Sequence, residues 1–358
     1  MISLGLQQPY ERSDAQAPLR PDPSSTATIH SLAMGRAACI VAKQPRARAT
    51  LALLGDKQFL FSTSGESFLM YRRTGRFFVA MGDPIGVESE WPELINRLCN
   101  MANEVKGCPV FYQAEPEALS VYESMGLSCM KVGEEARVTL SDFTLQGSKK
   151  SRLRQTLRRA ERAGGTFEIY PARSAWSLLE ELRSVSDCWL ENKHTREKGF
   201  SLGSFDPTYL MRCPIAVVRQ EGKIVAFANV WQGNEGGELG VDLMRYSSEA
   251  SESVMEYLFI KLLLWGQEQG YSQFSLGMAP LAGLDSLESK SFWNRAGATL
   301  YKHGERFYNF RGVHAYKSKF KPEWESRYLV SPGGLGVPMA IAAVGSLVAG
   351  GARGLIAR

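Results

Sequence analysis

The chain has 358 residues, of which 44% are hydrophobic, and this is enough for two hydrophobic cores of ordinary size. Its 42 lysine and arginine residues exceed its 37 acidic residues, which gives a net charge of +5 and an isoelectric point of about 8.8. This excess falls short of the strongly basic composition typical of nucleic-acid-binding domains. An argument for a polyanionic partner must therefore rest on where the charges lie.

The placement of cysteine and histidine argues against a metal centre. The six cysteines form no CxxC pair, and no two of the four histidines have the i, i+4 spacing with which a helix binds a metal. We therefore expect buried, reduced thiols and no metal. The chain also lacks a G-x-S-x-G elbow, a P-loop and a dinucleotide-binding fingerprint, so hydrolase and dinucleotide chemistry are disfavoured and no cofactor is expected.

The two ends of the chain differ from its middle. The first 30 residues combine acids and prolines without an apolar core, which excludes a signal peptide, and we expect a flexible leader over residues 1–48. Residues 331–358 are rich in alanine, valine, leucine and glycine, but glycine and proline interrupt them too often for a membrane span. They predict an apolar helix or tail, either packed or acting as a surface anchor.

Between these ends, hydrophobic periodicity predicts two successive mixed α/β units, divided near residue 145 into domains at 49–145 and 146–330. The first unit is expected to contain strands at 59–61, 67–71 and 76–80, a helix at 91–103, a strand at 110–112 and a helix at 116–125. The second is expected to contain a helix at 175–191, strands at 215–219, 223–231 and 237–245, a helix at 252–267, a strand at 273–276, a helix around Phe292 and a last strand at 305–310. The pattern suggests a duplicated fold, although no sequence repeat is evident.

A predicted helix at 149–163 carries seven cations beside a narrow apolar stripe of Leu153, Leu157 and Ala160. Clustered cations bind RNA phosphates or anionic lipid headgroups. The alternative is an ordinary solvated helix face, although like charges at i, i+4 repel and reduce helix stability. The candidate phosphate-binding residues are Lys149, Lys150, Arg152, Arg154, Arg158, Arg159 and Arg162.

Charged residues also interrupt the apolar strand predicted at 237–245. In a straight strand Glu238, Asp242 and Met244 share one face and Arg245 points to the other. A single site that contains both Asp242 and Arg245 therefore requires a bulge or the end of the strand. The alternative is a structural ion pair between layers of the fold.

Two later segments also suggest ligand contacts. Residues 274–283 run from a strand into a glycine and proline turn, where backbone amides approach a substrate closely, although a plain loop explains the pattern equally well. Residues 304–328 alternate aromatic residues with cations, which suits phosphate and sugar contacts or, alternatively, a basic helix whose aromatics close the core.

In their order and spacing, a set of segments that includes Val241-Asp242-Leu243-Met244-Arg245 resembles the synthase domain of the multiple peptide resistance factor (MprF) family, the lysyl- and alanyl-phosphatidylglycerol synthases. The resemblance covers about residues 49–330. The matching segments are 54–57, 82–84, 149–162, 197–203, 226–229, 241–245, 276–281, 303–310, 316–320 and 327–329.

The resemblance implies two tandem acetyltransferase-like (GNAT) folds, as in the Fem transferases. It implies transfer of an amino acid from aminoacyl-tRNA to phosphatidylglycerol, on the cytoplasmic side of the bacterial inner membrane, which alters membrane charge and resistance to cationic antimicrobials. The overall likeness to proteobacterial members favours alanine over lysine. Family members usually carry an N-terminal flippase region that is absent from this sequence, so we expect an excised domain or a soluble variant.

The implied reaction is attack by a lipid hydroxyl on the ester between an amino acid and the tRNA ribose, which needs positioning and charge stabilisation rather than ATP. The resemblance favours Asp242 for the α-ammonium or the hydroxyl proton, and Arg245 for a phosphate or for support of Asp242. The other candidates are Glu238 and Glu305 for amino-group recognition, Lys317 and Arg306 for the lipid phosphate or the oxyanion, and Tyr308, Met278 and Lys319 as substrate contacts.

Two other functions remain open. A Fem-like or GNAT acyltransferase acting on a peptide or small-molecule amine would share the fold, but no glycine-rich pyrophosphate loop of a coenzyme A user precedes Trp91 or Glu252. A non-enzymatic RNA- or membrane-binding module would need only the basic helix, and the charges within 238–245 argue against it.

Overall fold

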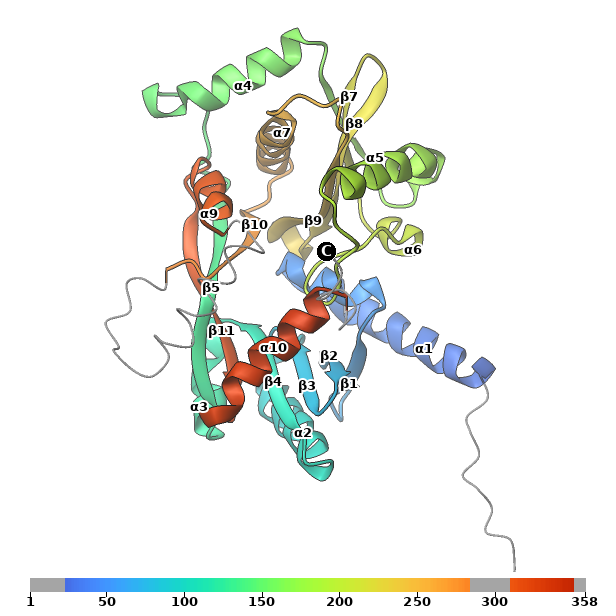
Figure 1. Cartoon of the computed structure of the whole chain (residues 1–358), viewed down its shortest axis with the longest axis vertical. Helices are drawn as coiled ribbons and strands as arrows, with labels where there is room; N and C mark the ends of the chain where they lie inside the picture. Colours follow the sequence, from blue (N-terminus) through green and yellow to red (C-terminus); the bar gives the residue numbers. More distant parts are fainter. Residues whose placement is uncertain (1–22, 284–309, 351–358) are drawn as a thin grey trace, which may run out of the picture.

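The computed structural model describes residues 23–283 and 310–350, which form a mixed α/β protein built on one sheet (Figure 1). The described strands follow the order β1-β2-β3-β4-β11-β5-β10-β9-β8-β7-β6. This confirms the mixed α/β class that the sequence predicts.

The first half of the chain forms hairpin-joined strands covered by helices. The turn that joins β2 to β3 follows Thr74, and its Gly75 has the positive φ, 54°, that glycine adopts readily. Helix α2 buries Leu94, Ile95 and Leu98 against the sheet, as its 3.6-residue period predicts. The elements are β1 (Gln58–Phe61), β2 (Phe68–Thr74), β3 (Phe77–Met81), α2 (Trp91–Glu104), β4 (Cys108–Ala114), α3 (Leu119–Ser124) and β5 (Ser128–Thr139).

The second half begins with the predicted basic helix. Helices α7 and α5 then cover opposite faces of its strands, each over its own apolar cluster. The elements are α4 (Ser151–Arg162), β6 (Thr166–Tyr170), α5 (Leu179–Asn192), α6 (Pro207–Leu210), β7 (Ile215–Gln220), β8 (Lys223–Gln232), β9 (Glu238–Tyr246), α7 (Val254–Glu268), β10 (Gln273–Pro280), α9 (Phe310–Ser318) and β11 (Glu323–Ser331).

The described elements repeat one series, β2–β3–α2–β4–α3–β5 and β8–β9–α7–β10–α9–β11, as the duplicated pattern predicts. The halves exchange their last strands, because β11 lies between β4 and β5, and β5 lies between β11 and β10. The boundary near residue 145 therefore separates the two series along the chain, but the sheet is continuous across it.

Two predictions about the strands need correction. The sequence does not predict β5 or β11, and the strand expected at 305–310 is wrong at Phe310, which begins helix α9. Residues 305–309 and the helix expected around Phe292 lie outside the described residues.

The ends of the described chain also form helices. The leader expected over residues 1–48 is wrong in part, because helix α1 (Pro23–Val41) and the 3-10 segment η1 (Ala47–Leu54) bury Ala37, Ile40 and Leu51 in the core. The predicted apolar C-terminal helix is α10 (Val337–Val348), which covers the sheet face opposite to α2. No helix within the described ranges is long and apolar enough to cross a bilayer.

Candidate active site

Strand β9 contains the bulge that a site with both Asp242 and Arg245 requires. Its pairing with β8 runs from Val230↔Val241 to Ala228↔Met244, so Asp242 and Leu243 both lie opposite the single residue Asn229. The side chain of Asn229 fills the gap by accepting a hydrogen bond of 2.7 Å from the Leu243 amide. The extra residue shifts the alternation of the strand, so Asp242 and Arg245, three residues apart, both lie on the side of α5 and α6, with Arg245 against Trp189 and Asp242 against Tyr209.

The carboxylate of Asp242 is enclosed by hydrogen-bond donors. The Gly203 amide donates to Oδ1 at 2.7 Å, and the Tyr209 hydroxyl donates to Oδ2 at 2.7 Å. Burial raises the pKa of Asp242, while these two hydrogen bonds oppose the rise. The Tyr209 hydroxyl accepts in turn from the Trp231 indole at 2.8 Å, so a chain of polar contacts runs inward from the carboxylate.

Arg245 lies beside Asp242, and each charge favours the ionised form of the other. Its guanidinium stacks 4.2 Å from the Trp189 ring centroid and pairs with Glu197 at 3.0 Å. Burial lowers the pKa of Arg245, against the opposing effect of Glu197. Its Nε atom is buried and lacks a hydrogen-bond partner within the described structure.

Three segments that are distant in sequence meet at this carboxylate. Residues 197–203 contribute the Gly203 amide and the Glu197 partner of Arg245, and the Phe200 amide donates to Asp56 at 2.9 Å. Lys57, whose side chain is fully buried, pairs with Asp56 at 2.5 Å and is also attracted by Asp242. Segments 54–57, 197–203 and 241–245, all part of the resemblance, therefore form one site.

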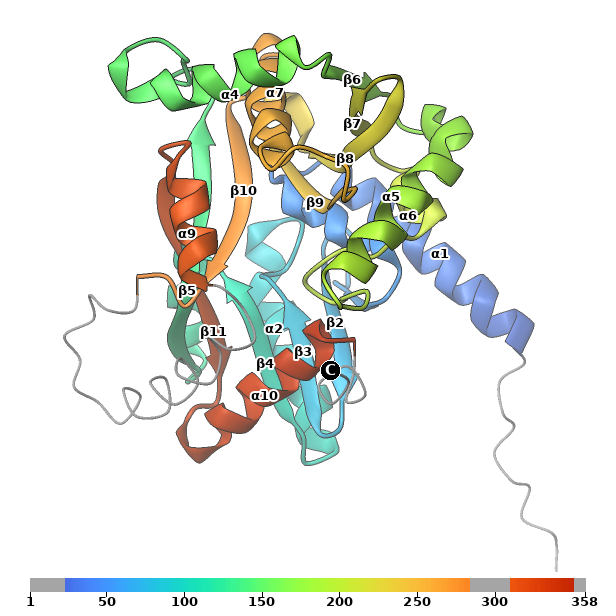
Figure 2. The same cartoon turned by 45° about the horizontal axis from the view of Figure 1, so that its top comes forward.

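Lys317 lies where β9 and β10 part. The two strands pair in parallel only from Gln273↔Glu238 to Ser275↔Gly240, and Figure 2 shows β10 continuing beside β5 while β9 stays beside β8. The Lys317 ammonium donates to the Met278 carbonyl at 2.9 Å. Burial lowers the pKa of Lys317 to about 8, against the attraction of Glu135. A buried ammonium group with a lowered pKa, at the point where two strands part, is a candidate for chemistry there.

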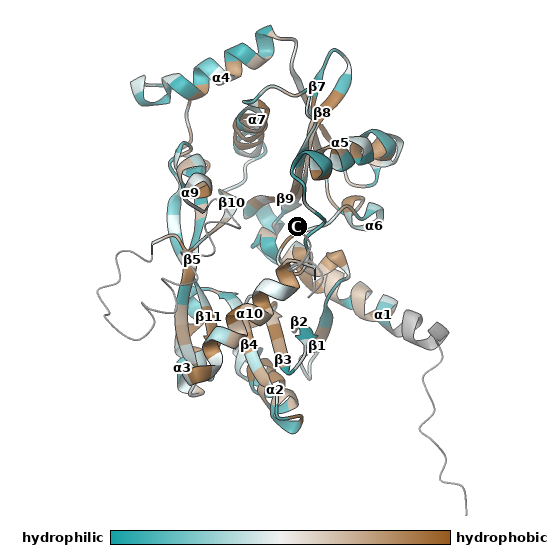
Figure 3. Cartoon of the chain, in the orientation of Figure 1, coloured by the Kyte–Doolittle hydropathy of each residue, from teal (hydrophilic) through white to brown (hydrophobic). Residues whose placement is uncertain are grey.

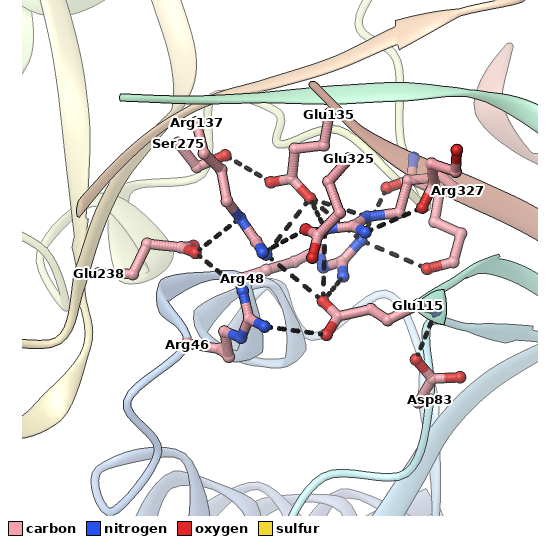
Figure 4. Close-up of polar contacts among 12 residues, drawn as sticks. Arg46, Arg48, Asp83, Glu115, Glu135, Arg137, Glu238, Ser275, Glu325 and Arg327 are labelled. Atoms are coloured by element: carbon pink, nitrogen blue, oxygen red, sulfur yellow. Dashed lines mark hydrogen bonds and ion pairs between the residues drawn. The ribbon is translucent and has the colours of Figure 1, made fainter. Parts of the chain in front are cut away.

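A network of arginines and glutamates joins the two halves of the sheet (Figure 4). Arg327 of β11 is its centre, because it is fully buried and bonds Glu135 at 2.9 Å and Glu325 at 2.7 Å. Although burial opposes ionisation, three arginines hold the pKa of Glu135 well below its usual range. The members of this joint network are Arg46, Arg48, Glu115, Glu135, Arg137, Glu238, Glu325 and Arg327.

Glu238 belongs to this joint network rather than to the Asp242 centre. Its carboxylate lies 3.2 Å from Arg137 and 3.7 Å from Arg46, and it is buried. Burial and then the charge of Glu135 raise the pKa of Glu238 to about 7. The surrounding arginines make this position unsuited to an ammonium group.

Comparison with known proteins places the chain in a family. A model described as "Phosphatidylglycerol lysyltransferase, C-terminal" matches residues 39–331. The chain belongs to this family. The phosphatidylglycerol lysyltransferase of Bacillus subtilis (strain 168) is 42% identical over 295 residues, which cover 82% of this chain and 34% of that protein. That of Staphylococcus aureus (strain MRSA252) is 36% identical over 277 residues, covering 77% and 33%, so this chain spans about a third of the length of these relatives.

Solved structures agree with the family assignment. The C-terminal domain of a putative lysylphosphatidylglycerol synthetase from Agrobacterium fabrum has a TM-score of 0.83 at 41% identity, covering 90% of this chain and 99% of that one. The L-PGS structure from Bacillus licheniformis has a TM-score of 0.76 at 36% identity, covering 92% and 97%. FemX, at 11% identity, has a TM-score of 0.53 over 87% and 98%, which supports the Fem-transferase-like fold alone.

The predicted basic helix of this family member is α4, but only part of its charge faces outward. Lys150 is buried and donates to the Phe320 carbonyl at 3.4 Å, and Arg154 donates to the Leu145 and Gly147 carbonyls. These two cations therefore hold backbone carbonyls near the start of α4 and do not face the solvent as the other cations do. The cations that remain exposed are Lys149, Arg152, Arg158, Arg159 and Arg162.

The other predicted contacts lie in different places. Lys319 pairs with Glu256 at 2.6 Å and so links the end of α9 to α7. Met278 is on β10, and its carbonyl accepts the hydrogen bond from Lys317 of α9. Glu305, Arg306 and Tyr308 lie outside the described residues. Within residues 23–283 and 310–350, no group of three or more His, Cys, Asp or Glu side chains is arranged to hold a metal ion.

Sequence reasoning assigned no role to Lys57, Glu197, Gly203 or Tyr209. The first three fall in segments that carry the family resemblance, which was the available signal. Tyr209 had no such signal, since its hydroxyl meets Asp242 only through the fold.

Proposed function

We propose that this chain transfers an amino acid from aminoacyl-tRNA to a glycerol hydroxyl of phosphatidylglycerol. The observation that carries the proposal is the meeting of three family segments at Asp242, next to the parting of β9 and β10. The names of the relatives point to the same lipid, and the proposal concerns a chain that spans about a third of their length.

In the proposed reaction, the lipid hydroxyl oxygen forms a bond to the ester carbonyl carbon, and the bond between that carbon and the tRNA ribose oxygen breaks. The proton of the lipid hydroxyl passes to the ribose oxygen that leaves. Negative charge develops on the carbonyl oxygen, and a cation positioned in advance lowers the barrier. Lys317 is our candidate for that cation, because its ammonium lies at the parting of the strands.

We assign Asp242 to positioning rather than to direct contact with substrate. Both of its oxygens already accept hydrogen bonds, and a Cβ atom on Gly203 would lie only 1.9 Å from Oδ2, so little space remains beside the carboxylate. Arg245, with an unsatisfied Nε, is the better candidate for holding a phosphate group of the lipid or the tRNA.

The two large substrates would approach over different surfaces. Figure 3 shows α4 as largely hydrophilic and α10 as largely hydrophobic. We propose that the exposed cations of α4 contact tRNA phosphates. We assign the lipid side to α10 and the turn before it. Leu335 in that turn is 85% exposed, Met339 in the helix is 50% exposed, and no charged residue occurs between 328 and 352. In this proposal the chain catalyses transfer at the cytoplasmic surface of the inner membrane, where tRNA and phosphatidylglycerol meet.

The relatives' names favour lysine as the transferred amino acid, whereas the resemblance drawn from the sequence favours alanine. A lysine site needs a carboxylate for the side-chain ammonium, while an alanine site needs only a small apolar recess. We propose lysine, and direct competition between the two charged tRNAs tests the choice.

The deciding experiment mixes the purified chain with radiolabelled lysyl- or alanyl-tRNA and vesicles that contain phosphatidylglycerol. We expect label to move into the lipid fraction, and faster from lysyl-tRNA. Vesicles of phosphatidylcholine alone are the matched control and should remain unlabelled. Label that stays on tRNA in every pairing refutes the proposal. Transfer to a peptide amine or from acetyl-coenzyme A would instead support the alternative Fem-like or GNAT activity.

A further inference from the structure

A cavity of about 500 Å³ opens at the entry to helix α4. It lies between the segment that joins β5 to α4 and the turn that joins α9 to β11. Three lysines line it, Lys149, Lys150 and Lys321, together with the hydroxyl-bearing residues Thr139, Thr144 and Ser148. Lys321 belongs to the run of aromatic residues and cations at 304–328, and the fold brings it beside Lys149 and Lys150, which lie about 170 residues earlier in the chain.

Lysines outnumber acids in the lining of this cavity. The two acids, Asp142 and Glu323, are both exposed, and neither forms an ion pair with the three lysines in the described structure. Lys150 is buried. In the described structure its ammonium donates to the Phe320 carbonyl and lies over the Phe143 ring. Burial, and then the charge of Lys321, lower the pKa of Lys150, which places two like charges close together. A bound anion relieves such repulsion.

The composition of the cavity favours a phosphate group. Lysine ammonium groups and hydroxyl groups commonly bind phosphate oxygens. The N-terminus of α4, the positive end of its dipole, begins at Ser151, directly after the 3-10 turn Ser148–Lys150. The exposed cations of α4, beginning with Arg152, continue from the cavity along the helix. A chain of phosphates that enters the cavity therefore finds further cations beside it, as a nucleic-acid strand requires.

We propose that this cavity binds a backbone phosphate of the tRNA, with Lys149 and Lys321 as its exposed ligands. The proposal rests on the proposed function for the choice of RNA. It differs from a membrane contact, because a concave site with hydroxyls holds one phosphate group, whereas the uncharged surface of α10 lies elsewhere on the molecule.

The test measures binding of uncharged tRNA by fluorescence anisotropy across a salt series, using Lys149→Gln and Lys321→Gln. Lys106→Gln is the matched control, since Lys106 is an exposed lysine just after α2, which lies at the opposite end of the molecule from α4 (Figure 1). We expect each cavity variant to weaken binding by about 3- to 10-fold near 0.1 M salt and to reduce the slope of log K against log salt by about one. The control should bind as the wild type does.

Equal binding of tRNA by wild type, Lys321→Gln and Lys321→Glu, with unchanged thermal unfolding, overturns the proposal. Flotation with anionic vesicles forms a separate arm, and a loss confined to vesicles would assign the cavity to lipid and also overturn it. Because binding of uncharged tRNA requires no transfer, failure of the cavity proposal is distinguishable from failure of the proposed function.

Discussion

The contact between Gly203 and Asp242 gives the sharpest prediction about the candidate site. In Gly203→Ala the added Cβ would lie 1.9 Å from Oδ2 and 2.7 Å from Cγ of Asp242. Unbonded carbon and oxygen atoms need more than about 3 Å, so the loop must move by about 1 Å or more. Such a shift breaks the 2.7 Å hydrogen bond from the Gly203 amide.

The expected cost follows from these two effects. Loss of a hydrogen bond to a charged group costs about 1.5–3 kcal/mol, and overpacking costs about 1–3 kcal/mol. We therefore expect the free energy of unfolding to fall by roughly 3 kcal/mol, with a loss of lipid aminoacylation because segment 197–203 also holds Arg245 through Glu197.

Urea denaturation and the lipid transfer assay measure both effects. Gly345→Ala is the matched control, since no atom lies within 4 Å of its added Cβ in the interior of α10. This control should gain about 0.5–1 kcal/mol from helix propensity and keep its activity. A Gly203→Ala protein as stable and as active as the wild type would show that the loop does not seal the Asp242 carboxylate.

Four further variants test the remaining assignments. Tyr209→Phe removes the hydroxyl that donates to Asp242 and should lower the free energy of unfolding by about 1–3 kcal/mol in urea; unchanged stability would contradict that contact. If the Lys317 ammonium is the active form, initial transfer rates corrected for ester hydrolysis should fall as pH rises through about 8, and Lys317→Arg should shift that fall to higher pH; a rate that rises there would assign Lys317 as a base. Arg327→Leu should cost about 3–5 kcal/mol at pH 7. This difference from wild type should shrink in denaturation below about pH 4, because the pKa of Glu135 is depressed in the folded state and its ion pairs therefore lose their stabilising effect as the pH falls below the unfolded pKa. Met339→Asp should reduce flotation with phosphatidylglycerol vesicles without altering thermal unfolding, since this side chain is half exposed.

The sequence predicts those elements of the fold that neighbouring residues in the chain determine. Helix α2 and the hairpin of β2 and β3 follow from periodicity and from the turn at Gly75. Strand β11 escapes prediction because its central residue, Arg327, is charged yet fully buried. Its partner Glu135 lies 192 residues earlier in the chain, and no local pattern reveals that compensation.

The same limit applies to the candidate site. The sequence identifies Asp242 and Arg245 and the need for a bulge between them, and the structure contains that bulge. It does not reveal that the Asp242 carboxylate is closed by Gly203 and Tyr209, which are 39 and 33 residues away. A charged residue in an apolar strand signals that a partner exists, but only the fold shows whether the partner is protein or substrate.

The joint network and the candidate site are coupled through strand β9. Glu238 and Asp242 stand at the two ends of one strand face, and Gly240 between them lies beneath η1, where a Cβ atom would sit 3.8 Å from Ala47. Arg46, which precedes η1, pairs with Glu238. Asp56 and Lys57, which follow η1, complete the surroundings of Asp242. Segment η1 therefore runs from the joint network at Arg46 to the surroundings of Asp242 at Asp56 and Lys57.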